Sequence, residues 1–207
     1  MIAVTLCTTL GSIFFDWFLI TYLIPDRSKR NHDGSPLYSY YLSVCVYQPA
    51  FIYLGLVAHS YPMGFVNVSA IIIAYAIRDF PNLNLQYHLY FHHIGMIFFT
   101  VATVTVSGWP RAASFFTASV LEAASWTKNV VHLAKGTTWF HTCAHLNQAV
   151  MLASHIVGIY WCVCMYKSTV CQFFKIFGPL ILIPVMILRQ FFSYQLTMWK
   201  KGLAKKS

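Results

Sequence analysis

The chain has 207 residues, of which 58% are hydrophobic and only 9% are charged. Soluble domains carry about 25% charged residues, so this composition excludes an ordinary soluble protein. The net charge of +9 does not indicate a nucleic-acid-binding protein, because the basic residues form no single face with interleaved aromatics. We interpret the chain as an integral membrane protein that forms one transmembrane domain over residues 1–207.

Apolar runs of about 20 residues are long enough to cross the ~30 Å hydrocarbon core of a bilayer as helices. Seven such runs predict an all-α bundle of about seven transmembrane helices, with six as the alternative count. In chain order they cover residues 2–24, 37–59, 65–80, 86–107, 111–133, 140–166 and 170–198. The last run contains Pro179 and Pro184, so we expect a distorted helix there.

The basic residues predict the orientation of this bundle, because cytosolic loops carry an excess of Lys and Arg. With seven spans, one side of the membrane holds only Arg111 and Lys167. The other side holds Arg27, Lys29, Arg30, Lys135, Lys200, Lys201, Lys205 and Lys206. This asymmetry places the basic tail 199–207 in the cytosol and the N-terminus in the lumen.

Three of the five acidic residues, Asp16, Asp79 and Glu122, lie in or at the ends of predicted spans. An ionisable group inside a membrane costs at least ~2.5–3.5 kcal/mol, so it normally faces the protein interior and has a function. In the predicted topology these acids and several histidines share the cytosolic half of the bundle. We therefore expect a polar cavity that opens to the cytosol.

Two helical faces carry most of these polar side chains. In the segment YHLYFHHIG (87–95), His88 and His92 are four residues apart and share a face, and His93 lies about 100° round the helix. In the segment 121–133, the spacing of three, four and three residues predicts a single stripe, formed by Glu122, Ser125, Asn129 and His132. Polar residues of this kind also hold membrane helices together, which is the structural alternative.

The segments AYAIRDF (74–80), YHLYFHHIG (87–95) and LEAASWTKNVVHL (121–133) resemble the TLC domain, and the region of strong similarity is 74–133. This domain occurs in ceramide synthases, in TRAM proteins and in a group of smaller TLC-domain membrane proteins. The shared order is a Tyr and an Asp before a loop, a His-His pair early in the next helix, and a Leu-Glu-x-x-Ser helix. Where ceramide synthases carry a second acid, this chain has Ser125, as the smaller proteins do.

The resemblance implies a role in lipid metabolism, sphingolipids included, and a location in the endoplasmic reticulum. Ceramide synthases join a fatty acyl-CoA to an amine, and by residue match His92 and His93 take the place of their catalytic pair. Asp79 would orient one imidazole, and Glu122 is the remaining acid. The cavity would bind lipid through His88, Ser125, Lys128, Asn129 and His132. No cofactor is expected besides acyl-CoA as a co-substrate, and no metal.

Whether the chain is an enzyme stays open at this point, as does assembly into a homodimer. A non-enzymatic regulator of membrane lipid composition is an equally favoured interpretation. A cargo receptor of the early secretory pathway is another, because the tail KKGLAKKS resembles a retrieval signal. A di-iron oxygenase is a further alternative, since His88-x3-His92-His93 and His141-x3-His145 resemble histidine boxes. The seven spans have no evident internal repeat, which ranks a transporter lower.

Overall fold

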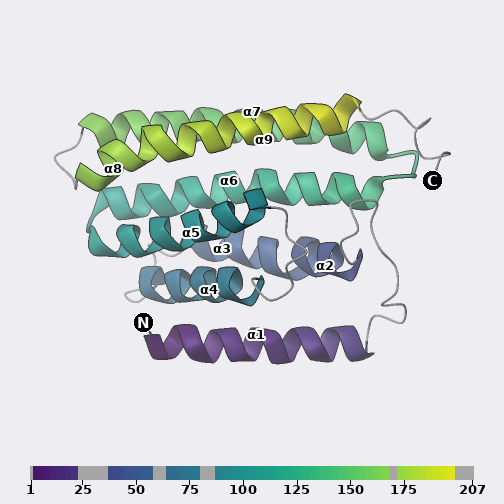
Figure 1. Ribbon diagram of the computed structural model, residues 1–207, viewed down its shortest axis with the longest axis horizontal. Coiled ribbons are helices and arrows are strands. Elements are labelled where there is room, and N and C mark those ends of the chain that lie inside the picture. The colour runs from purple at the N-terminus through teal and green to yellow at the C-terminus, as the bar shows by residue number, and fades with distance from the viewer. Residues whose placement is uncertain (1, 23–36, 58–63, 80–86, 168–171, 199–207) are drawn as a thin grey trace. The chain divides into compact units, whose positions relative to one another are not determined.

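The structure is a computed structural model, and it describes residues 2–22, 37–57, 64–79, 87–167 and 172–198 (Figure 1). All regular elements in these ranges are helical, and the ranges contain no strand. The elements are α1 (Ile2–Tyr22), α2 (Leu37–Leu42), the π-helical turn η1 (Ser43–Tyr47), α3 (Gln48–Val57), α4 (Gly64–Asp79), α5 (Tyr87–Thr105), α6 (Trp109–Ala134), α7 (Phe140–Lys167), α8 (Gln172–Phe177), the π-helical turn η4 (Gly178–Leu182) and α9 (Ile183–Met198).

The prediction of an all-α fold is confirmed for the described residues, since all seven predicted apolar runs are helical there except for residues 106–107 at the end of the fourth run. Three described helical stretches are long and apolar enough to cross a membrane, namely Tyr40–Val57, Phe140–Lys167 and Pro179–Met198. Shorter apolar stretches cover Ala3–Phe18, Gly64–Ile77 and Tyr90–Thr105. Helix α6 is 26 residues long but is in neither group, because polar and charged residues interrupt its apolar sequence. The basic tail 199–207 lies outside the described residues.

Both π-helical turns end two residues before a proline. Pro49 follows η1 and Pro184 follows η4. A proline has no N–H, so it cannot bond the carbonyl four residues earlier, which belongs to Cys45 in the first case and to Leu180 in the second. In η1 the backbone adopts the wider bond from Gln48 N–H to Ser43 O. The predicted distortion of the last span is thus confirmed: η4 contains Pro179 and ends two residues before Pro184, the two prolines from which the distortion was predicted.

Helix contacts divide the chain into two compact units, which we describe separately. Unit 1 covers Met1–Phe116 and unit 2 covers Thr117–Ser207, so α6 contributes to both. In unit 1, α4 lies beside α1 and beside α5 (Figure 1). A buried cluster joins α3, α4 and the start of α6, and partly buried apolar residues surround it. The cluster consists of Phe51, Val68, Ile72 and Phe115, with Leu54, Phe65 and Met96 packed against it.

The turn between α5 and α6 is held by Arg111. Its guanidinium donates hydrogen bonds to the carbonyls of Val106 and, at 3.3 Å, of Val104, near the end of α5 where carbonyls lack helical partners. The same group lies over the ring of Phe65, 5.6 Å from its centroid. Gly108 has φ +68°, a conformation that favours glycine and lets the chain reverse here.

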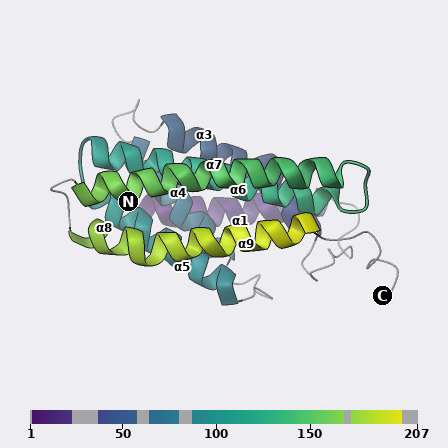
Figure 2. The same ribbon diagram turned by 90° about the horizontal axis from the view of Figure 1, so that it is seen from above.

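In unit 2, α7 and α9 run alongside each other (Figure 2). They pack tightly at Gly158, where an added Cβ would lie only 2.7 Å from Met186 Sδ. An apolar cluster of Val131, Phe140 and Ala144 joins α6 to α7. One turn further along α7, the buried Asn147 bridges three helices: its Oδ1 accepts from Thr127 Oγ1 of α6 (3.0 Å), and its Nδ2 donates to Ser193 Oγ of α9 (2.5 Å).

We predict that Asn147→Ala lowers the free energy of unfolding by about 1–2 kcal/mol, because it removes the hydrogen bonds to Thr127 and Ser193, while Thr127 keeps only its bond to the Ala124 carbonyl. Thermal or denaturant unfolding of the protein in detergent measures this change. Asn67→Ala is the matched control, since Asn67 is exposed on α4. Equal stability of the two variants would contradict a bridging role for Asn147.

Candidate functional site

The side chain of His93 is buried in unit 1 and faces the end of α4. Its Nδ1 lies 3.3 Å from the carbonyl oxygen of Ala76. Because a carbonyl only accepts, this contact places the proton of the neutral ring on Nδ1 and the lone pair on Nε2. Ala76 lies in the last turn of α4, where backbone carbonyls lack helical partners. The geometry therefore orients His93 with Nε2 as its basic atom.

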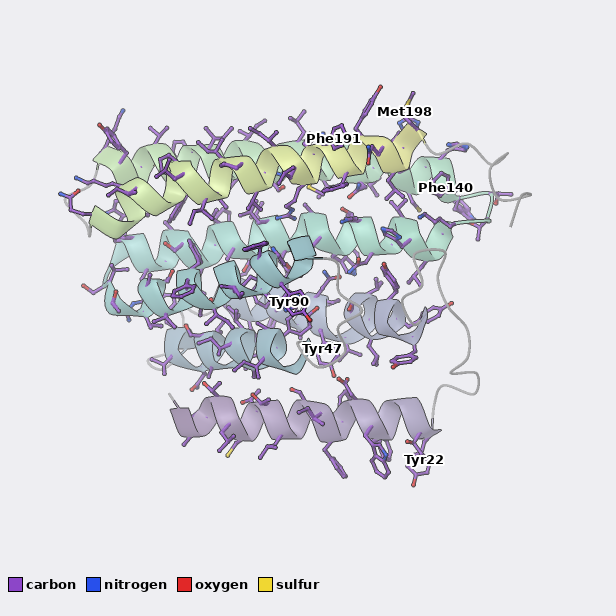
Figure 3. All side chains as sticks on the ribbon, in the orientation of Figure 1. Tyr22, Tyr47, Tyr90, Phe140, Phe191 and Met198 are labelled. Atoms are coloured by element: carbon purple, nitrogen blue, oxygen red, sulfur yellow. The ribbon has the colours of Figure 1, made fainter. Side chains whose placement is uncertain are left out.

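A row of aromatic rings connects His93 to a carboxylate on α1. The ring of Tyr75 stacks on His93, with centroids 6.0 Å apart and planes inclined by 25°. On the other side, Tyr75 contacts Tyr47 at 5.7 Å. The Tyr47 hydroxyl donates a hydrogen bond to Asp16 (Tyr47 is labelled in Figure 3). Four segments, α1, η1, α4 and α5, thus contribute one residue each to a row that runs from Asp16 to His93.

His92 completes the histidine pair. It is half-buried, and its ring meets that of His93 edge to face, with centroids 5.7 Å apart and planes inclined by 71°. The two predicted catalytic histidines therefore contact each other directly. A proton or an acyl group on one ring would lie next to the second ring.

Two further predicted site residues fall at the ends of the same helices. Asp79 is the last residue of α4, and His88 is the second residue of α5. Their side chains lie outside the described part of the structure, so their predicted contacts stay predictions. Among the described residues, the carbonyl of Ala76 contacts His93, and the predicted orienting role of Asp79 stays a prediction.

The predicted stripe on α6 belongs to unit 2. Glu122 is buried, and the other members, Ser125, Asn129 and His132, are half-buried, as is the neighbouring Lys128. The stripe meets α9 through Arg189, whose Nη2 donates to the carbonyl of Leu121 (2.7 Å) and to Ser125 Oγ (2.9 Å). Glu122 lies close enough to Arg189 to interact with it electrostatically. Within unit 2, Ser125 and Glu122 of this stripe therefore interact with the guanidinium of Arg189.

Sequence reasoning missed the residues that hold these side chains in place. Tyr47 and Tyr75 are two of 13 tyrosines, and nothing in their spacing distinguishes them from lipid-facing aromatics. Arg189 did carry a signal, since a lone arginine inside an apolar run is expensive unless it has a partner. The π-helical turn at Tyr47 was also detectable, because Pro49 interrupts an otherwise apolar run and π-helical turns are frequent at functional sites.

Among the described residues, no group of three or more His, Cys, Asp or Glu side chains is placed to hold a metal ion. The histidine box that includes His88 falls partly outside those residues. Comparisons with family models, with curated proteins and with solved structures find no match.

Lys135 follows α6 in the short turn to α7, outside the apolar stretches, and is half-buried. Burial lowers the pKa of Lys135 from its usual 10.5 to about 8, because the charged ammonium loses hydration. In the folded protein this amine is partly neutral at slightly alkaline pH.

The contact between Tyr47 and Asp16 is tested by a double-mutant cycle. We expect Tyr47→Phe and Asp16→Ala each to destabilise the protein, with a coupling energy of about 1 kcal/mol because both remove the same hydrogen bond. Unfolding midpoints in detergent give the four stabilities. Tyr53→Phe, at an exposed tyrosine of α3, should change nothing. Strictly additive effects of the two variants would show that the contact contributes no stability.

Lys135 also predicts a pH dependence. Below about pH 8 the folded state bears the cost of a half-buried charge, so Lys135→Met should be more stable than the wild type there. Between about pH 8 and 10.5 the folded protein has lost this proton and the unfolded chain still binds it, so wild-type stability rises and the difference shrinks. Thermal unfolding at a series of pH values measures this trend, with the exposed Lys167→Met as control. A pH-independent difference would contradict the lowered pKa.

Proposed function

We propose that this chain is a multi-pass membrane protein of lipid metabolism that binds acyl lipid and transfers an acyl group, with His93 as the general base and His92 beside it. The long apolar helices support a membrane location, and the resemblance to TLC domains supports an acyl-CoA co-substrate. The single observation that carries the proposal is the orientation of His93, whose Nδ1 faces the Ala76 carbonyl and whose Nε2 is therefore the basic atom.

The proposed chemistry follows from that orientation. Nε2 of His93 accepts the proton of an amine or hydroxyl while that group attacks the thioester carbonyl carbon of an acyl-CoA. A new C–N or C–O bond forms, the C–S bond breaks, and the thiolate leaves with the proton returned by the imidazolium. A general base in this position contributes about 10²–10⁴-fold to a rate. His92, in ring contact with His93, is placed to bind the acyl donor or to relay the proton.

A second function, regulation of membrane lipid composition without catalysis, is favoured by one observation. Glu122 interacts with Arg189 inside unit 2, which gives this acid a structural partner. The α6 stripe would then bind lipid or join helices and take no part in catalysis. For both functions we place the protein in the endoplasmic reticulum with the tail 199–207 in the cytosol.

A paired lipid analysis tests the proposal. Wild type and a His92→Ala, His93→Ala double variant are expressed at matched levels in cells that lack the endogenous protein. The acyl profiles of sphingolipids and glycerophospholipids are then compared. We expect the wild type to restore the profile and the double variant to fail, because the base is lost. His145→Ala is the matched control, since His145 is exposed on α7.

Each remaining outcome has a defined meaning. Equal restoration by wild type and double variant would make the histidines structural and refute acyl transfer at this site. Failure of the His145 variant as well would favour a histidine-box metal enzyme. Purified protein incubated with acyl-CoA and candidate amines or alcohols then separates catalysis from regulation, because only a transferase releases free CoA.

A further inference from the structure

Helix α5 carries a glycine next to the histidine pair, and the acyl transfer proposed above does not use it. Gly95 lies in the interior of α5, three residues after His92, so the two positions are neighbours on the helix surface. Glycine inside a helix is less favourable than alanine because it loses more backbone freedom on folding. Three needs can offset this cost: a positive φ, tight packing against another helix, or the close approach of a ligand to the backbone.

The first two needs do not apply to Gly95. The described glycines with a positive φ are Gly108 and Gly136. Tight packing requires the glycine at Gly158, where an added Cβ would lie 2.7 Å from Met186 Sδ. At Gly95 an added Cβ would meet no atom of the described residues within 4 Å. The close approach of a ligand is therefore the need that fits this position.

The open space at Gly95 lies between two exposed aromatic rings. Phe91 lies four residues before Gly95 and Phe98 three residues after it, and they are 75% and 60% exposed. Because successive residues turn by about 100° round a helix, these three positions lie within about 60° of one another, and Gly95 is the one nearest to His92. We call this place the Gly95 gap: it is bounded along the helix by Phe91 and Phe98, and His92 lies at its side.

The surroundings of the Gly95 gap indicate which kind of group fits it. In the proposed membrane location, the two phenylalanine rings face hydrocarbon, since they belong to the apolar stretch Tyr90–Thr105. The half-buried imidazole of His92 is the polar group at the side of the gap. An acyl chain matches both features, because its methylenes pack on apolar rings while its carbonyl group can accept a hydrogen bond.

We propose that the Gly95 gap is the subsite through which an acyl chain reaches the histidine pair from the membrane, and that Gly95 limits the size of what can lie there. The first methylenes of the chain cross α5 at Gly95, between Phe91 and Phe98, and the acyl carbonyl lies at His92. An acetyl group has no chain to occupy the gap. The role of His92 rests on the proposed acyl transfer, whereas binding of the chain can be measured apart from catalysis.

The test uses the full chain in phosphatidylcholine nanodiscs and a palmitoyl-CoA analogue that carries a diazirine close to its carbonyl carbon. After irradiation, labelled peptides are quantified by mass spectrometry. We expect saturable labelling within residues 91–98, which excess palmitoyl-CoA suppresses and excess acetyl-CoA does not. This comparison uses wild-type protein only, so it does not depend on the folding of any variant.

A size series at Gly95 locates the subsite. Gly95→Leu should lose about tenfold in saturable labelling, because roughly two methylenes of the acyl chain lose their contacts, and Gly95→Ala should lose less. Both variants should unfold at a higher temperature than the wild type, since the new side chain favours the helix and an added Cβ meets no neighbour. Binding and stability thus move in opposite directions, so unfolding cannot explain the loss.

Gly11→Leu is the matched control. Gly11 is equally open, but its helix α1 contains no histidine, so the variant should gain stability and label like wild type. Labelling that is not saturable, or that palmitoyl-CoA fails to suppress, would overturn the proposal, because the gap would then hold only bulk lipid. Unchanged labelling of Gly95→Leu would overturn it too, as would an equal loss in Gly11→Leu.

This test and the lipid analysis can fail separately. Saturable labelling at the Gly95 gap, together with an acyl profile that the double histidine variant restores, would refute acyl transfer and keep the subsite. No labelling at the gap, together with a profile that depends on the histidines, would refute the subsite and keep acyl transfer.

Discussion

A polar group that is removed from water is costly unless it finds a hydrogen-bond partner, and the contacts between the helices of each unit reflect that constraint. Side chains satisfy helix carbonyls at three places: His93 at Ala76, Arg111 at Val104 and Val106, and Arg189 at Leu121. The first two are near helix ends, where carbonyls lack partners. The third carbonyl, that of Leu121, lies in the middle of α6. There the hydrogen bond offsets the cost of burying the guanidinium of Arg189.

The same requirement ties structure to chemistry at the histidine pair. The bond between His93 and the Ala76 carbonyl joins α5 to α4 and favours the tautomer with its proton on Nδ1, and in the proposed acyl transfer this contact would also prepare the base. The row of Tyr75, Tyr47 and Asp16 extends this order to α1. A side chain held from several helices loses little further freedom on reaction, and a base needs this preorganisation when it acts on a bound lipid.

In unit 2, polar residues between apolar helices join those helices. Asn147 of α7 accepts a hydrogen bond from Thr127 of α6 and donates one to Ser193 of α9. Arg189 of α9 donates to the carbonyl of Leu121 and to Ser125 Oγ of α6. Both side chains therefore satisfy polar groups on a neighbouring helix that water cannot reach.

The sequence by itself determined the elements of this protein. Apolar runs of helical length predicted the helices, and Pro179 and Pro184 predicted the distortion before α9. The spacing of Glu122, Ser125, Asn129 and His132 predicted one face of α6. Each of these predictions follows from local geometry. The partners of those faces were beyond sequence reasoning. These partners are residues far apart in the chain or on different helices. Examples are the contact of His93 with Ala76, the row from Tyr75 through Tyr47 to Asp16, and the contact of Arg189 with Ser125. Only the tertiary structure decided them, because helical periodicity sets the direction of a side chain on its own helix and leaves open which other helix it meets.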